Sequence, residues 1–469
     1  MKRLVTALCM TAVFAAAAAE NPQDVVSVAT DREATAITVY NDDLALVKEQ
    51  RKVQLPAGMV RLSLREVSGQ MRPETALLRA VTGSPITLVE QNFDFDLLTP
   101  GKLLEKYVGR DVTVLRAHPT TGEERAERAR VLSANSGTVL RFTDRIETGV
   151  PGRIVFDSVP GNLRDRPTLS VVLEGAGGNQ SLELSYLTAG LSWKADYVAN
   201  LAADNQSMDL SGWVTLTNRS GAAYADASLQ LVAGTVNRVR SPQPMMAYAM
   251  PPPAPASKRA DVAQESLMDY HLYSFERPTS IEENQTKQLA LLSAGAIPVR
   301  QEYLLSGSEY YYRDRYGQIG QKLKPAVFVE FENKGGQLGK PLPGGVVRVY
   351  AKDSKGAAQF VGEDRIEHTA KNEKVKLKLG EAFDITAERK QMSFKKLGDT
   401  TAESAFRIEI RNAKDAAVMV RVQEPLPGDW EMVQETHPHT QESARIATWN
   451  IPVPTGGTTI LEYTARVRW

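Results

Sequence analysis

Four tyrosines and two arginines gather in one short stretch of the chain, at Tyr310, Tyr311, Tyr312, Arg313, Arg315 and Tyr316. Tyrosine rings offer flat apolar faces with a polar tip, and a guanidinium group donates paired hydrogen bonds. This combination is typical of surfaces that bind sugars or the loops of partner proteins. We therefore predict a binding surface here, and the alternative is an edge strand with half-buried tyrosines.

Catalysis by carboxylates would need two acids that face each other across a cleft. Three close pairs of acids are candidates, and none sits in a specific motif: Asp94 with Asp96, Glu363 with Asp364, and Asp384 with Glu388. The chain contains neither a Gly-x-Ser-x-Gly nucleophile motif nor a His-Glu-x-x-His zinc motif. We predict no catalytic residue, and an enzyme is the less favoured class.

Histidine positions do not predict a metal centre. His437 and His439 lie close together, but His118, His271 and His368 have no spacing relation to them. A metal site needs further ligands with a defined geometry. An exposed turn is the favoured interpretation of the two neighbouring histidines.

Two further motifs resemble ligand-binding sites, one for copper and one for phosphate, but neither fits on closer inspection. The thioethers of Met245, Met246 and Met250 could bind Cu(I), but the prolines and alanines around them are typical of a flexible linker. Gly339-Lys340 resembles the end of a phosphate-binding loop, but Pro341 stands where that loop needs Ser or Thr. We predict no metal and no cofactor.

The first residues have the layout of a secretion signal. Two basic residues precede an apolar stretch, Leu4–Phe14, and the small residues Ala15–Ala19. Such a segment is removed on export and is too short to span a membrane. We predict a signal peptide at 1–19, cleaved before Glu20, and a mature protein in the periplasm or cell envelope. Because Cys9 is the only cysteine, the mature chain would hold no disulfide.

Charge and hydropathy narrow the classes of partner. Lys and Arg total 56, and Asp and Glu total 56. The signal peptide carries two of the basic residues, so the mature chain has 54 against 56, a net charge of −2. This balance gives no electrostatic case for nucleic acid, and no later apolar run approaches the ~18 residues of a transmembrane helix. An envelope protein or a glycan is the expected partner, and the oligomeric state stays open.

Most of the chain alternates apolar and polar residues with a period of two, as antiparallel strands with one buried face do. The runs include Val60–Leu64, Leu169–Leu173, Leu182–Tyr186, Trp193–Ala199, Val375–Leu379 and Phe406–Ile410. The stretch Gly175–Gln180 predicts a hairpin turn between two of them. Helix signals are few: Thr99-Pro100 starts a helix that ends at Gly109, and Thr286–Ala294 is a second possible helix.

These patterns predict an all-β, multi-domain protein of antiparallel β-sandwiches with a small SH3-like barrel module and few short helices. After the signal peptide we place an N-terminal β region at 20–98, a helix-plus-barrel module at 99–160, a β-sandwich part at 161–240, a Pro/Met-rich flexible linker or insertion at 241–278, a continuation of the β-sandwich at 279–400, and a C-terminal immunoglobulin-like sandwich at 401–469. The linker is predicted because its prolines cannot donate to a sheet ladder.

Several motifs carry a family resemblance. They are LSYLTAGLSWKADY at Leu184–Tyr197, GWVTLTNRSG at Gly212–Gly221, LVAG at Leu231–Gly234, LGKPLPGGVVRVY at Leu338–Tyr350, and GED at Gly362–Asp364. The region from Leu182 to Trp469, the C-terminal two thirds of the chain, resembles the exported β-rich family known as domain of unknown function 4139. The resemblance implies a β-sandwich-like fold and an envelope setting, and it brings no activity, substrate or catalytic residue.

Taken together, the residues favour a non-catalytic binding or scaffold protein in the periplasm that presents loops on rigid sandwiches. One alternative is an envelope hydrolase with carboxylates in an interdomain cleft. The other is a protein associated with an outer-membrane β-barrel, because the chain ends in the alternating residues Leu461, Tyr463, Ala465, Val467 and Trp469, as outer-membrane strands do.

Overall fold

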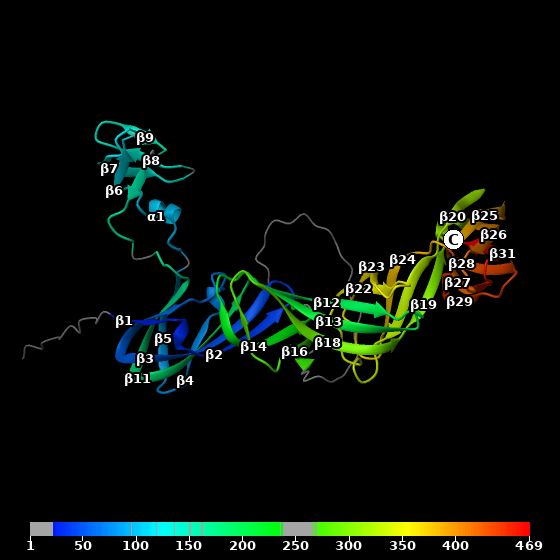
Figure 1. The fold of residues 1–469 in the computed structure, drawn as a ribbon, viewed down its shortest axis with the longest axis horizontal. Coiled ribbons are helices and arrows are strands. Elements are labelled where there is room, and N and C mark those ends of the chain that lie inside the picture. Colours follow the sequence, from blue (N-terminus) through cyan, green and yellow to red (C-terminus); the bar gives the residue numbers. More distant parts are fainter. Residues whose placement is uncertain are drawn as a thin grey trace, which may run out of the picture.

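The computed structural model describes residues 22–94, 96–118, 120–135, 137–149, 152–160, 163–234, 236–237, 266–267 and 270–469. The proposed signal peptide and most of the Pro/Met-rich segment, with Met245, Met246 and Met250, lie outside these residues. The β-sheets follow one another along an elongated body, and a small module stands off its N-terminal end (Figure 1). The predicted all-β class is confirmed: α1 (Pro100–Lys106) is the single α-helix among the described residues, beside the short 3₁₀ turns η1 (Ala29–Asp31), η2 (Pro73–Thr75) and η3 (Glu309–Tyr312).

The N-terminal sheet has ten strands in the order β15-β16-β14-β2-β3-β11-β4, with β1, β5 and β17 paired beside this path. Its strands are β1 (Gln23–Ser27), β2 (Arg32–Tyr40), β3 (Leu44–Arg65), β4 (Leu77–Thr82), β5 (Ile86–Asp94), β11 (Thr168–Thr188), β14 (Tyr224–Ala233), β15 (Ser266–Leu267), β16 (Tyr270–Ser274) and β17 (Thr279–Ile281). Two of its pairings, β1 with β3 and β14 with β2, are parallel, so the sheet is not purely antiparallel.

The hairpin predicted at Gly175–Gln180 is wrong. The chain continues through this stretch as one long strand, β11, which is antiparallel to β3 from Thr168 to Thr188. Gly177 and Gly178 have left-handed φ angles of 83° and 94°, which glycine adopts without steric cost. The glycines therefore bend the strand at this point and do not reverse it.

The small module forms a separate unit with its own core. It contains α1, β6 (Asp111–Ala117), β7 (Glu124–Ser133), β8 (Val139–Arg141), β9 (Ile146–Thr148) and β10 (Arg153–Val155), in the sheet order β10-β6-β7-β8-β9. The predicted start of α1 is confirmed, because the Thr99 side chain accepts a hydrogen bond of 3.2 Å from the Lys102 N–H and Pro100 opens the helix. The module lies between β5 and β11, which pair with each other in the N-terminal sheet, so it is an insertion.

The central sheet has the order β18-β13-β12-β22-β23, and its strands are β12 (Leu191–Leu201), β13 (Ser207–Asn218), β18 (Thr286–Pro298), β22 (Gly345–Lys352) and β23 (Ala358–Ile366). The helix proposed for Thr286–Ala294 is wrong, since β18 pairs along β13. Trp193 and Tyr197 share the buried face of β12, as their spacing predicts. This sheet continues the hydrophobic core of the N-terminal sheet.

Two further sheets complete the chain. The six-stranded sheet β24-β21-β19-β27-β30-β29 contains β19 (Arg300–Ser306), β21 (Ala326–Glu332), β24 (Lys374–Glu381), β27 (Val418–Pro425), β29 (Thr440–Ser443) and β30 (Ile446–Val453). The five-stranded sheet β20-β25-β26-β31-β28 contains β20 (Gln318–Leu323), β25 (Ile385–Lys396), β26 (Thr401–Asn412), β28 (Asp429–Glu435) and β31 (Thr458–Arg468). The C-terminal sandwich thus takes strands from residue 300 onward, earlier than the position 401 given by the sequence.

The six-stranded sheet is shared between two cores. Val329 and Phe331 of β21 pack in the core of the central sheet. Val420 and Val422 of β27 pack in the C-terminal core, together with the five-stranded sheet. The alternating C-terminal residues Leu461, Tyr463, Ala465 and Val467 are buried in that second core. The central and C-terminal sandwiches are therefore joined through one sheet, with β18 leading directly into β19.

Candidate functional site

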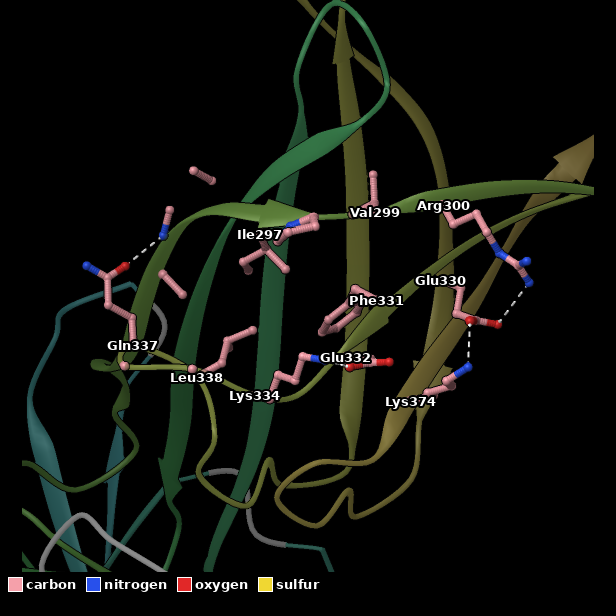
Figure 2. A pocket seen from close by; sticks show the side chains of 16 residues that line it. Ile297, Val299, Arg300, Glu330, Phe331, Glu332, Lys334, Gln337, Leu338 and Lys374 are labelled. Carbon is pink, nitrogen blue, oxygen red and sulfur yellow. Dashed lines mark hydrogen bonds and ion pairs between the residues drawn. The ribbon is translucent and has the colours of Figure 1, made fainter.

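A cleft of about 880 Å³ opens where β18 passes into β19 (Figure 2). One wall is the end of β18, and the other is the end of β21 with the loop 333–338 that follows it. The floor is apolar and buried, and it is formed by Ala294, Ile297, Phe331 and Leu338. The cleft thus reaches the edge of the hydrophobic core at the joint between the two sandwiches.

One buried amide fixes the loop that walls the cleft. The Asn333 side-chain N–H₂ donates to the carbonyls of Lys340 (2.7 Å) and Ala370 (2.9 Å), and its Oδ1 accepts from the Gly339 N–H (3.1 Å). Across the cleft, the Gln337 Oε1 accepts from the Gly295 N–H at 2.8 Å. Gly339-Lys340 is therefore part of a turn held by its backbone, in keeping with the rejection of a phosphate-binding loop.

The rim of the cleft is charged and internally paired. Glu330 lies between Arg300 (3.9 Å) and Lys374 (3.5 Å), and Lys334 pairs with Glu332. The hydrogen bond and charge of Lys334 hold the pKa of Glu332 below its ordinary value. A general acid needs the opposite, a raised pKa. The apolar floor and paired rim suit the binding of a ligand, and proton transfer by Glu332 is disfavoured.

The predicted tyrosine stretch lies away from this cleft, on the C-terminal sandwich. Tyr310 is 51% exposed, and its ring meets the rings of Tyr311 and Tyr316 edge-on, with centroids 4.6 Å and 5.6 Å away. The stretch folds as η3 and the turn after it, and it is not an edge strand. We call the group formed by the exposed Tyr310 and the half-buried Tyr311 and Tyr316 the tyrosine surface.

Tyr312 does not belong to this surface, because its side chain is fully buried. Its hydroxyl lies 2.9 Å from the Tyr463 hydroxyl and donates to Glu424 Oε2 at 3.2 Å. Its ring meets Phe406 edge-on at 5.1 Å. Tyr312 is therefore the anchor that attaches the tyrosine stretch to the sandwich core, and the prediction that it contacts a ligand is replaced by this role.

A second anchor is Gln391, which the sequence analysis did not identify. Its Nε2 donates to the carbonyls of Tyr311 and Asp314, both at 3.1 Å, and its Oε1 accepts from the Tyr316 N–H at 2.6 Å. Gln391 is itself buried. One side chain thus fixes three backbone positions of the tyrosine stretch.

The arginines divide between surface and core. Arg313 is exposed and forms a 3.8 Å ion pair with Glu309, and Arg315 is exposed. Beneath the tyrosines, Arg389 places its guanidinium carbon 5.1 Å from the ring centre of Tyr311 and pairs with Glu424 at 2.5 Å. The sequence offers one signal for this buried cation, since Arg389 shares strand parity with apolar residues of β25.

The other candidate residues have structural partners. His439 pairs with Glu435 at 2.9 Å and packs between the rings of Trp430 and Trp449. Asp94 contacts Arg164, Asp96 contacts Lys106, Glu363 contacts Arg348, Asp364 accepts from the Lys378 N–H, and Glu388 contacts Lys390. Asp384 is exposed at the start of β25, and its carbonyl accepts from the Ala413 N–H.

Within the described residues, no group of three or more His, Cys, Asp or Glu side chains could hold a metal ion. In the same part of the chain, no helix has the length and apolar character needed to cross a membrane.

Comparison with known proteins agrees with the motifs of the C-terminal two thirds. A protein-family model, Domain of unknown function (DUF4139), matches residues 182–469. A comparison with curated proteins found no match. The matched region covers β12 to β31 and the last third of β11, and therefore includes both the cleft and the tyrosine surface. The chain belongs to the DUF4139 family.

Proposed function

We propose that this is an exported, non-catalytic binding protein of the cell envelope, and that its tyrosine surface contacts a partner protein. Aromatic residues and arginine are enriched in protein interfaces and supply much of their binding energy. Tyr310, with Arg313 and Arg315 close by in the chain, offers both residue types in an exposed position.

One observation carries the proposal: the exposed ring of Tyr310 lies on a stretch of chain that is anchored to the sandwich core. Tyr312 is inserted in the core, and Gln391 holds the backbone at three positions. Exposed aromatic groups that are already ordered lose little conformational entropy when they bind. Tyr312 alone is enough to anchor the stretch to the core. The exposed ring of Tyr310 is not needed for that anchoring, which supports a contact with a partner.

The test compares a double variant with a single control variant in the full chain. Tyr310→Ser with Tyr316→Ser removes two rings of the tyrosine surface and leaves Tyr312 and Gln391 in place. Phe383→Ser is the matched control, since Phe383 is 82% exposed elsewhere on the same sandwich. A photo-crosslinking residue at position 313 should yield one partner adduct in the parent and the control, and the adduct should be lost in the tyrosine variant. Equal crosslinking in all three proteins would refute the tyrosine surface as the contact.

Export is tested separately. Mass spectrometry of the mature protein should find an N-terminus at Glu20, and osmotic shock should release the protein from a Gram-negative-type cell. A full-length product retained in the cytoplasm would contradict the envelope setting and would leave the binding surface to be judged by the crosslinking alone.

A further inference from the structure

The outward face of the central sheet carries an exposed tryptophan on an interior strand. Trp213 of β13 is 40% exposed, and it lies opposite Asp196 of β12 and Ala290 of β18. Among the described residues its indole N–H has no hydrogen-bond partner. The indole ring has a large apolar area, and leaving it in contact with water is unfavourable. An exposed tryptophan in the middle of a sheet therefore points to a ligand that covers the ring.

A continuous line of polar contacts runs beside Trp213 and crosses all five strands of the sheet. Gln288 of β18 donates to Thr215 of β13 (3.3 Å), and Thr215 donates to Asp196 of β12 (2.8 Å). Arg348 of β22 donates to the other oxygen of Asp196 (3.1 Å) and pairs with Glu363 of β23 (3.2 Å). These contacts hold the donors and acceptors of the row in place.

An aromatic pair lies on the same face as Trp213. Tyr350 and Phe360 are directly paired between β22 and β23, with ring centres 5.7 Å apart, and Phe360 is 56% exposed. Tyr350 follows Val346, the partner of Asp196 in the ladder, by four residues, which is about 13 Å along the strand. Trp213 and the Tyr350–Phe360 pair therefore form two aromatic platforms on the same side of the polar row, several sugar rings apart, with Val198 of β12 between them.

The charges of this face are nearly balanced. Its outward positions include four basic residues, Lys194, Arg348, Lys352 and Arg365, and three acidic residues, Asp196, Asp209 and Glu363. A nearly neutral face has little electrostatic attraction for nucleic acid or for another anionic polymer. The Asp196–Arg348–Glu363 contacts run along one side of the aromatic groups, so the apolar strip has a polar border.

We infer that the outward face of the central sheet binds a neutral, β-linked polysaccharide. A β-1,4-linked pyranose with equatorial hydroxyls has flat faces of C–H groups, which are attracted to the negative face of the indole ring. Its in-plane hydroxyls can donate to the Asp196 and Glu363 carboxylates and accept from the Arg348 guanidinium. Trp213 stacks on one sugar, and the Tyr350–Phe360 pair contacts a sugar farther along the chain.

This site is independent of the tyrosine surface, so each proposal can fail without the other. Calorimetry on the mature full chain would compare cellohexaose and chitohexaose, which share the β-1,4 linkage, with α-linked maltohexaose and with heparin. We expect one or both β-linked hexasaccharides to bind, each at least tenfold more tightly than its disaccharide, because two platforms are used. Binding of heparin alone, or no binding of either β-linked chain, would overturn the inference.

Variants locate the site. Trp213→Ala should weaken hexasaccharide binding at least tenfold, and Phe360→Ala should weaken the hexasaccharide but not the disaccharide. Phe383→Ala, which removes an exposed aromatic ring between β24 and β25, should bind as the parent does. If Trp213→Ala fails to fold, Trp213→Tyr and Glu363→Ala replace it, with circular dichroism as the folding check. Unchanged affinity in a folded Trp213 variant, or a protein crosslinked at position 213 with no glycan bound, would reject the assignment.

Discussion

Each end of the molecule buries a charged pair among apolar side chains. Glu49 pairs with Arg51 in the N-terminal sheet at 2.6 Å, and Glu424 pairs with Arg389 in the C-terminal sandwich. Desolvation of both charges offsets most of their attraction, so such a pair adds little net stability. Removing only one partner is strongly destabilising, because it leaves the other charge buried and unpaired.

We expect Glu424→Leu to lower the free energy of unfolding by about 3–5 kcal/mol, because Arg389 would keep its charge in the core. The double variant Arg389→Met, Glu424→Leu should recover most of this loss, since neither charge remains. Urea denaturation of the parent, both single variants and the double variant measures the coupling. Equal instability of the single and double variants would show that the pair contributes through packing, and not through charge.

Asp196 gives a pH-dependent prediction. Burial acts to raise its pKa, but hydrogen bonds from Thr215 and Arg348 and the charge of Lys194 outweigh burial and hold the pKa below its ordinary value. The folded protein therefore releases this proton more readily than the unfolded chain. Asp196 contributes stability above the unfolded pKa of about 3.9, and this contribution is lost as the pH falls through the folded value.

The parent should thus be more stable than Asp196→Asn by about 1 kcal/mol at pH 7. The difference should shrink from about pH 4 downward. Thermal unfolding of both proteins between pH 7 and pH 3 measures this dependence. If the stability difference between the two proteins stays constant from pH 7 to pH 3, the charge of Asp196 does not contribute to stability.

At the scale of elements, alternation predicted strands well where one face meets a core. The runs at Trp193–Ala199 and Phe406–Ile410 are strands with their apolar residues buried, as expected. The strand β18 was missed because its Leu- and Ala-rich sequence has high helix propensity, and pairing with β13 overrides that preference. The glycines of β11 were misjudged because a bend and a reversal both use left-handed φ angles.

The candidate site was predictable only in part. The sequence shows that the tyrosines are close together, but it does not show which ring is buried. Burial depends on the turn η3 and on strands from other regions of the chain. Tyr312 meets Glu424 and Tyr463, which lie more than a hundred positions further along the chain. The row beside Trp213 likewise combines five strands, and its members share no motif in the sequence.

The turn between β11 and β12 depends on Gly190. Its φ is 83°, and an added Cβ would lie 2.6 Å from the Ser220 Cα and 2.7 Å from the Ser220 N. We expect Gly190→Ala to cost about 2–4 kcal/mol, from left-handed strain and backbone displacement. Gly178→Ala is the control, since Gly178 has φ 94° with no atom within 4 Å; it should cost only about 1 kcal/mol. Chemical denaturation measures the free energy of unfolding of both variants. Equal losses of stability would mean that the backbone near Ser220 shifts to accommodate the added Cβ without cost.

At the scale of the whole molecule, the inserted module is joined to the body at one place. The Leu98 N–H donates to the Arg164 carbonyl at 2.8 Å, and the Arg164 N–H donates to the Asp96 carbonyl at 3.0 Å. Its core, which includes Tyr107, Val114 and Phe142, is separate from the two larger cores. A unit with adjacent ends and its own core can fold and unfold independently of its host.

We therefore predict that residues 96–164 can be replaced by a short Gly/Ser linker without unfolding the rest. Asp94 and Thr168, which flank the module, are already paired in the β5–β11 ladder, so a short loop can join the two strands. Calorimetry of the full chain should show a separate transition that the deletion variant lacks, and the isolated module should reproduce it at a similar or slightly lower temperature. The other transitions should stay within a few degrees of the parent. An insoluble deletion variant that lacks β-sheet circular dichroism would show instead that the body needs the module to fold, and the elongated molecule would then have to be treated as one cooperative unit.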